Sequence, residues 1–438
     1  MKKSYNIFTI LAFIALLFPM LASFMKNDKN PHLTGIVINN NNPDSLLKKD
    51  KSMWFSSEYQ NLKDDYNNDH WAFKELFVRL NNQFYYDAFN QLRVNGFVSG
   101  KENYVFSETY IFSAFGDDYI GKNKIVSRLQ KLKVIQDTLQ EKGIDLFVAL
   151  APGKGEYCVG QIEDKYKHPI VHTNYDDFAS VTKQLGLNLL DLKSYFQKLK
   201  ATTPYSLFPQ FGHHWSYYGE CLATDTIIGY IENLHHCDMP NISWKNIEVV
   251  DTARSRDADV LKSMNLYKNP KQTMKLAYPE VLFENDTAKN KTRVLALSDS
   301  YWYGPVYLGV GHNCFADGQF WYYYNKIIPN PSPTEKVEVW QLDLKQSLES
   351  NNVVMILYSD GNLPNFANAF IEDVYEMYAS PKTYYARVAL EKSVKQFAKQ
   401  IRETPGLLKK STKKSIDLHI PLDSAIKLEA MKLSGVKL

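Results

Sequence analysis

The sequence has little that would support metal or nucleic-acid chemistry. Its 438 residues contain four cysteines, and because no two form a CxxC pair the spacing excludes a cysteine-based metal cluster. The loop Pro152-Gly153-Lys154-Gly155 lacks the GxxxxGK[ST] spacing of a phosphate-binding loop. Lysine and arginine number 51 against 48 aspartates and glutamates, so no overall charge favours a polyanion. We expect neither a metal site nor a nucleic-acid partner.

A single long hydrophobic run stands at the N-terminus. Residues 4–25 carry no charge, and about 20 apolar residues suffice to span a bilayer. Lys2 and Lys3 precede the run and favour a cytoplasmic N-terminus. We therefore predict a single-pass anchor at 1–26 in the cytoplasmic membrane, with the rest of the chain in the periplasm or otherwise outside. A cleaved signal peptide is the alternative, disfavoured because Met20-Leu21-Ala22-Ser23 is a poor cleavage site.

Three further regions follow the anchor. Residues 27–52 are rich in Asn, Lys and Asp and predict a flexible tether. Residues 53–380 alternate apolar runs with helical patterns, which predicts an α/β domain with a parallel sheet covered by helices on both faces. Residues 381–438 are Lys-rich and helical in pattern, and we expect a helical appendage.

Short apolar runs mark the strands of this domain, and apolar spacing of three and four residues marks its helices. The expected strands are Ile144–Ala151, Asn188–Leu192, Val294–Leu297, Val337–Leu344 and Val353–Tyr358, with a two-strand turn at Phe97–Phe106. The expected helices include Ile125–Lys142, Asp176–Leu185, Lys193–Leu199 and Trp215–Tyr230, and one or two within Tyr59–Asn90. The polar stretch Asn241–Asn265 is expected to be irregular.

The most informative stretch is Arg293–Gly304, RVLALSDSYWYG. Its buried strand ends at Ser298-Asp299-Ser300. A serine at the carboxyl end of a parallel strand lies at the edge of a crevice, where the N–H groups of the next helix can hold an oxyanion. We predict Ser300 as a nucleophile, with a simple polar turn as the alternative. Asp299 is expected to bond the backbone of its own turn.

A serine nucleophile needs a base for its proton. His214 is the best candidate, because Gly212-His213-His214-Trp215-Ser216 opens a helix and can present a side chain to a cleft.

An ordered set of motifs resembles the secreted SGNH-hydrolase-like proteins of the alginate O-acetylation type. The matching segments are Asn68–Lys74 (NDHWAFK), Gly100–Phe106 (GKENYVF), Pro152–Lys154, His213–Ser216 (HHWS) and Ser298–Tyr301 (SDSY), in the family's order. Together they cover roughly Tyr59 to Met377. The ordered set is far more specific than any one motif.

The resemblance implies a three-layer SGNH-like (flavodoxin-like) fold and O-acetyl transfer to an exported polysaccharide or other surface glycan. It implies that Ser300 accepts the acetyl group and that His214 deprotonates it. A polytopic membrane-bound O-acyltransferase is the expected partner and acetyl source, and neither a metal nor an organic cofactor is implied. The residues expected to line the cleft are Lys154, Trp215, Tyr301 and Asn362.

One departure from the family is important. Gly212 stands where the family carries the Asp that orients the histidine, and in a serine triad loss of that acid lowers the rate by ~10⁴. The candidate substitutes are Asp257, Asp259 and Asp191. Two alternatives to the transferase stay open: an acetyl esterase using the same Ser300 and His214, and a non-catalytic subunit that binds glycan or the acyltransferase.

Overall fold

The computed structural model describes residues 9–10, 13–14, 17, 32–35, 42–70, 73–286 and 288–435. The predicted anchor at 1–26 lies outside these ranges except for a few scattered positions. Among the residues that are described, no helix has the length and apolar content needed to cross a membrane.

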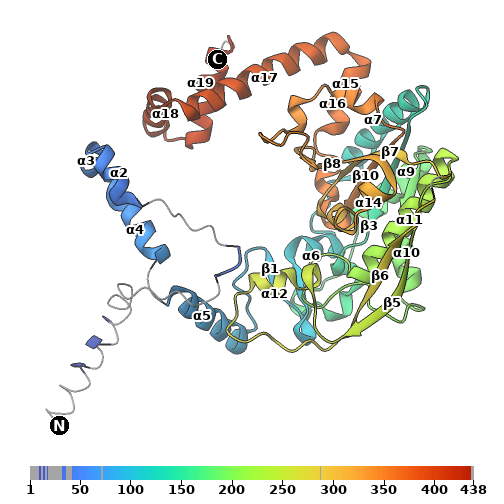
Figure 1. Cartoon of the computed structure of the whole chain (residues 1–438), viewed down its shortest axis with the longest axis horizontal. Coiled ribbons are helices and arrows are strands. Elements are labelled where there is room, and N and C mark those ends of the chain that lie inside the picture. The colour runs from blue at the N-terminus through green and yellow to red at the C-terminus, as the bar shows by residue number, and fades with distance from the viewer. Residues whose placement is uncertain are drawn as a thin grey trace.

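The centre of the molecule is a six-stranded sheet with the order β4-β3-β10-β7-β8-β9 (Figure 1). The strands are β3 Asp145–Ala151, β4 Leu189–Asp191, β7 Thr292–Ser298, β8 Phe315–Tyr322, β9 Lys326–Ile328 and β10 Val353–Ser359. All neighbours are parallel except β8 and β9. The sheet is mainly parallel, as predicted, and the exception is one edge, where β9 returns beside β8 after a short turn.

Helices cover both faces of this sheet, as the sequence predicted. Alternate side chains of each buried strand enter opposite cores: in β10, Met355 belongs to one cluster and Ile356 to the other. The helices on the Met355 side include α6 Glu108–Phe115, α10 Leu192–Leu199 and α11 Tyr217–His235; those on the Ile356 side include α7 Lys122–Gln140, α9 Asn174–Gln184 and α16 Phe370–Ala379. The layer order is therefore helix, sheet, helix.

Two predictions of secondary structure are wrong: the strand at Val337–Leu344 and the irregular stretch at Asn241–Asn265. Val337–Leu344 is not a strand, because Asp343 caps the helix α15 (Leu344–Glu349) by accepting a hydrogen bond from the Gln346 N–H at 3.0 Å. The stretch expected to be irregular contains β5 (Ile242–Val250), which pairs antiparallel with β6 (Leu276–Phe283). Most β5 side chains are solvent-exposed on one face, so the strand lacks the apolar run that marks a buried one.

Helices α2 (Pro43–Lys49) and α3 (Ser52–Phe55) occupy part of the range predicted as a flexible tether. They pack against α4 (Glu58–His70), and α5 (Lys74–Phe89) follows. His70 is exposed and stacks on Tyr66, so it does not pack this helix onto the sheet.

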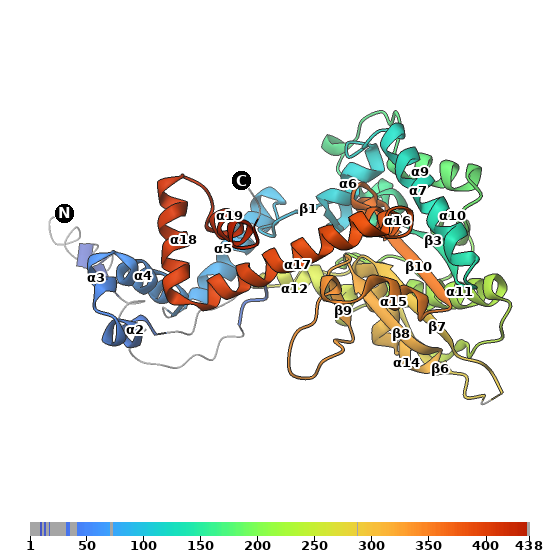
Figure 2. The same ribbon diagram turned by 90° about the horizontal axis from the view of Figure 1, so that it is seen from above.

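The predicted helical appendage is present at the C-terminus. It consists of α17 (Pro381–Glu403), α18 (Pro405–Asp417) and α19 (Leu422–Leu433), which share a small core around Ile401 and Ile426. Both views place this appendage at the same end of the molecule as α2 and α3, away from the sheet (Figures 1 and 2).

Lys154 holds two loops together at the carboxyl end of β3. It begins α8 (Lys154–Tyr157), is fully buried, and its Nζ donates hydrogen bonds to the carbonyl oxygens of Val105, Gln210 and Gly212 at 2.7–2.9 Å. Val105 lies in the hairpin of β1 (Phe97–Ser99) and β2 (Val105–Ser107), whereas Gln210 and Gly212 precede His214. Burial lowers the pKa of the ammonium group to about 8. Lys154 is thus a structural residue, and its expected place in the cleft is wrong.

Replacing Lys154 by methionine should reduce the free energy of unfolding by about 2–4 kcal/mol, because three buried carbonyls lose their donor. The midpoint of urea unfolding, followed by tryptophan fluorescence on the detergent-solubilised chain, measures the change. Lys124→Met on the exposed side of α7 is the control and should stay within about 0.5 kcal/mol of wild type. Equal midpoints for the two variants would contradict the structural role.

Candidate active site

Ser300 lies directly after β7, in the short 3-10 helix Ser300–Trp302. The buried carboxylate of Asp299 fixes this turn. Its Oδ1 accepts from the Tyr301 N–H at 3.0 Å, and its Oδ2 accepts from the Ser359 N–H (2.9 Å) and hydroxyl (2.7 Å) at the end of β10. Oδ2 also accepts from the Asn362 amide at 2.9 Å. The prediction that Asp299 bonds backbone is confirmed, and it ties the ends of two central strands together.

His214 meets Ser300 at this edge of the sheet. The His214 Nε2 lies 2.8 Å from the Ser300 Oγ, although 86 residues separate the two in sequence. The turn that carries His214 is fixed by Ser216, which caps α11 by accepting from the Gly219 N–H. The distance is that of a hydrogen bond, as removal of the hydroxyl proton requires.

Trp215 and Tyr301 do not line a cleft, contrary to our expectation. Both are buried, with ring centroids 4.7 Å apart, and Tyr301 also packs edge-on against His214. Trp215 further stacks on Phe196 of α10. These aromatic contacts hold the histidine turn against the serine turn.

Asp259 stands on the other side of the histidine ring. Its Oδ2 lies 3.5 Å from the His214 Nδ1, and its Oδ1 accepts from the His213 N–H at 3.0 Å. Burial opposes ionisation of Asp259, but its interaction with His214 and the hydrogen bond from the His213 N–H outweigh the effect of burial, so the pKa of the carboxyl group is lowered. The 3.5 Å separation is longer than an ordinary hydrogen bond, as is common for catalytic contacts without substrate.

The other two candidate acids lie elsewhere. Asp257 is buried and accepts from the Tyr217 N–H at 3.1 Å. Asp191 caps α10 and accepts from the Tyr175 hydroxyl at 2.8 Å. Of the three acids, the structure brings only Asp259 to His214.

The structure explains why glycine occupies position 212. A Cβ on Gly212 would come within 2.5 Å of the Pro209 ring and 3.0 Å of the carbonyl oxygens of Arg256 and Asp257. The segment that fills this space continues into α12 (Asp259–Ser263), so the residues that exclude a side chain at 212 also deliver Asp259.

A small apolar cluster positions this segment. Val260 of α12 and Met264, which caps it, pack with Phe211 of the histidine turn and Val105 of the hairpin. The Leu261 N–H donates to the Phe211 carbonyl at 3.3 Å. The carboxylate is thereby attached to the same framework as the histidine.

His213 is not the base. Burial, with the adjacent His214, lowers the pKa of its imidazole to about 3, and its ring stacks on Tyr110 at 4.7 Å. It is a neutral packing residue. The adjacent pair thus has two roles, and only the geometry distinguishes them.

Tyr323 is a site residue that the sequence analysis missed. Its backbone N–H donates to the Ser298 carbonyl oxygen at 2.9 Å, which attaches it to the serine turn. Burial raises the pKa of its phenol, and Asn362 and Ser300 oppose the increase. It follows β8 with φ of +49°, a backbone conformation that is uncommon for a residue other than glycine. No sequence motif marks it; three consecutive tyrosines after an apolar run were the only signal.

Asn362 was correctly expected at the carboxyl end of a strand. Its amide group bridges Asp299 and the Ser359 hydroxyl, so it supports the serine turn.

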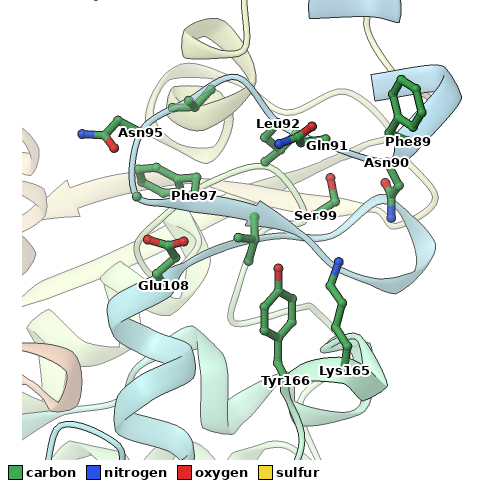
Figure 3. A pocket seen from close by; sticks show the side chains of 13 residues that line it. Phe89, Asn90, Gln91, Leu92, Asn95, Phe97, Ser99, Glu108, Lys165 and Tyr166 are labelled. Carbon is green, nitrogen blue, oxygen red and sulfur yellow. The ribbon is translucent and has the colours of Figure 1, made fainter. Parts of the chain in front are cut away.

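A cavity of 450 Å³ lies beside the β1–β2 hairpin (Figure 3). Ser99 and Tyr166 project into it from the hairpin and from the neighbouring 3-10 turn, and the Ser99 hydroxyl is buried without a hydrogen-bond partner. Phe97 lines the cavity and lies 5.5 Å, between ring centroids, from His213. His213, His214 and Ser300 are not among the residues that line this cavity.

In the ranges that the structure describes, no three His, Cys, Asp or Glu side chains gather as metal ligands. A serine at a strand end, a histidine on its hydroxyl and a carboxylate behind the histidine form the arrangement of enzymes that transfer or hydrolyse acyl groups through serine. The described site therefore contains the three kinds of group that such chemistry requires.

Part of the chain matches a known family. Residues 98–295 match the family described as the SGNH hydrolase-like domain of acetyltransferase AlgX. The resemblance predicted from the motifs is confirmed over this range, which includes His214 and Asp259 and ends just before Ser300. No curated protein sequence matches the chain.

Three solved structures are similar to it. They are the O-acetyltransferase domain of Pseudomonas putida AlgJ (17% identity, 64% of this chain and 99% of that one, TM-score 0.44), Bacillus cereus PatB1 (15%, 61% and 96%, 0.38) and Pseudomonas aeruginosa AlgX (11%, 63% and 66%, 0.41).

Asp259→Asn should lower the rate of acetyl-ester turnover by about 10²-fold or more, because the amide cannot stabilise the imidazolium. Asp257→Asn is a matched control, since it removes a carboxylate two residues away that does not contact His214, and its rate should stay within about threefold of wild type. Steady-state hydrolysis of 4-nitrophenyl acetate measures both. Equal losses of rate in the two variants would show that Asp259 has no specific role in the reaction.

Proposed function

We propose that this protein transfers acetyl groups to hydroxyl groups of an extracytoplasmic glycan through an acetyl-serine intermediate on Ser300. The 2.8 Å contact between the His214 Nε2 and the Ser300 Oγ carries the proposal. The match of residues 98–295 to an acetyltransferase family supports acetyl as the transferred group.

In the first half-reaction the Ser300 Oγ attacks the carbonyl carbon of the acetyl donor, and its proton passes to the His214 Nε2. The donor's leaving group takes that proton as it departs, which leaves acetyl-Ser300. In the second half-reaction a glycan hydroxyl gives its proton to His214 and attacks the same carbonyl carbon. The protonated imidazole returns the proton to the Ser300 Oγ, and the acetylated glycan leaves.

Asp259 stabilises the imidazolium in both steps and holds the ring in place. The Tyr323 hydroxyl is our candidate donor to the oxyanion, because the Tyr323 backbone binds the serine turn at Ser298, Ser300 influences the pKa of the phenol, and burial keeps the phenol protonated. A buried phenol of this kind stabilises negative charge that develops on the carbonyl oxygen.

The expected partner remains a membrane-bound O-acyltransferase that supplies acetyl groups across the membrane. We place the domain outside the cytoplasmic membrane on the strength of the apolar run at 4–25 and the lysines before it. The reason to favour a non-catalytic subunit was Gly212, and the carboxylate of Asp259 beside His214 now supports catalysis instead.

Ser300→Ala should abolish acetylation of an added oligosaccharide, and His214→Ala should match it. The double variant should be no worse than either single one, because the two residues act as a unit. Mass spectrometry of the oligosaccharide after incubation with purified full-length protein and 4-nitrophenyl acetate measures the product.

Tryptophan fluorescence and the urea midpoint of Ser300→Ala serve as the control, since loss of one partly exposed hydroxyl should leave folding intact. Ester hydrolysis without any acetylated sugar in the wild type would favour the esterase. Normal acetylation by Ser300→Ala would exclude both enzymes.

Tyr323→Phe should lower kcat by about 10²-fold with little change in KM, because the lost hydrogen bond forms mainly in the transition state. Tyr324→Phe is the matched control: this neighbouring tyrosine also has a positive φ, but its hydroxyl interacts with Asp373 of α16. An unchanged kcat in Tyr323→Phe would mean that groups other than the Tyr323 hydroxyl stabilise the oxyanion.

A further inference from the structure

The charge of this protein is concentrated at one end of the chain. Residues 381–438 carry 13 lysines and arginines against 5 aspartates and glutamates, whereas residues 1–380 carry 38 against 43. The near balance of the whole chain therefore hides a strongly basic appendage on a slightly acidic body. The proposed acetyl transfer gives this appendage no task.

The outward side of α18 carries part of this charge. Lys409, Lys413 and Ile416 are exposed and occupy positions i, i+4 and i+7, so they share one face of the helix. The opposite face packs through Leu407 and Leu408 into the core of the appendage. Within the described ranges, Lys409 and Lys413 form no salt bridge, whereas Lys410 and Lys414 pair with Glu429.

Exposed aliphatic side chains adjoin these lysines. Ile416 is 66% exposed, Leu418 51% and Leu422 37%, and all three surround the turn between α18 and α19. Water-exposed aliphatic groups at a helix end are costly unless something covers them.

Helix α3 adds aromatic side chains at the same end of the molecule. Trp54 is 51% exposed and Phe55 88%. Both views show α3 and α18 at this end (Figures 1 and 2).

We propose that α18, the α18–α19 turn and α3 form a membrane-contacting surface that binds anionic lipid headgroups. Unpaired lysines are attracted to an anionic bilayer, each contributing about 1 kcal/mol near its surface. Exposed aliphatic side chains next to those lysines enter the boundary of the acyl chains, and tryptophan prefers that interface. A polyanionic glycan would satisfy the lysines but leave Ile416 and Leu418 in water.

The position of this surface in the sequence agrees with the proposal. Helix α2 begins only 17 residues after the end of the predicted anchor at residue 26, so α3 follows the bilayer closely along the chain. A second contact through α18 would fix the orientation of the body, and with it the edge of the sheet that carries Ser300, relative to the membrane.

Hydrogen exchange on the full-length chain tests the proposal independently of catalysis. The chain is reconstituted in nanodiscs of phosphatidylcholine alone or with phosphatidylglycerol added. We expect amide exchange in residues 405–433 to slow several-fold in the anionic discs, and the protection to disappear at 1 M salt, where the Debye length is about 3 Å.

The double variant Lys409→Gln/Lys413→Gln should lose this protection. Lys271→Gln/Lys275→Gln removes two exposed lysines from the body and should retain it. Ile416→Ser/Leu418→Ser should reduce the protection at low salt as well, because it removes the inserting groups. In phosphatidylcholine discs, each variant should exchange in α17 and α19 at the wild-type rate, which verifies that it is folded.

Equal exchange of the wild type in the two kinds of disc would overturn the proposal. Protection by a soluble polyuronate but not by the anionic discs would overturn it in favour of a glycan-binding surface. Neither outcome depends on Ser300, so the test is separate from that of acetyl transfer.

Discussion

The buried carboxylate of Asp299 determines where the chemistry of this protein is located. It receives hydrogen bonds from the Tyr301 N–H, from Ser359 and from Asn362, and therefore joins the ends of β7 and β10. A buried charge is tolerable only when such donors surround it, and these donors come from two strands and the turn after each. Ser300 consequently has one position, at the carboxyl edge of the sheet, and the other groups of the site are placed around it.

The histidine reaches Ser300 through a second set of constraints. Lys154 binds the carbonyl oxygens that precede the turn, Trp215 packs the turn against Tyr301, and α12 closes the space beside Gly212. These contacts are buried, and none of them touches a reacting atom. Three residues with prominent sequence signals, Lys154, Trp215 and Tyr301, thus support the site from behind, while the less conspicuous Asp259 lies beside His214.

Asp259 takes the place of the family's orienting Asp because of how the chain packs around Gly212. With glycine at 212, the backbone of residues 256–257 approaches closely, and the chain then turns into α12 with Asp259 at its start. A carboxylate from 45 residues further along the chain thereby occupies the neighbourhood of His214. The lowered pKa of Asp259 keeps it ionised at neutral pH, which is the form that stabilises an imidazolium.

The sequence by itself determined the strands β3, β7 and β10, because residues buried on both faces form uninterrupted apolar runs. It also identified Ser300 and His214, since a serine after such a run and a histidine at a helix start follow from local pattern and from family motifs. The prediction from the sequence missed β5, because its exposed residues hide the two-residue alternation of a strand. It was also wrong at Val337–Leu344, where Asp343 caps α15 despite a strand-like alternation. The tertiary structure alone chose Asp259 over Asp257 and Asp191, and it alone brought Tyr323 to Ser300. The physical reason is that contacts between distant segments depend on how loops pack, and no periodicity along the chain encodes them.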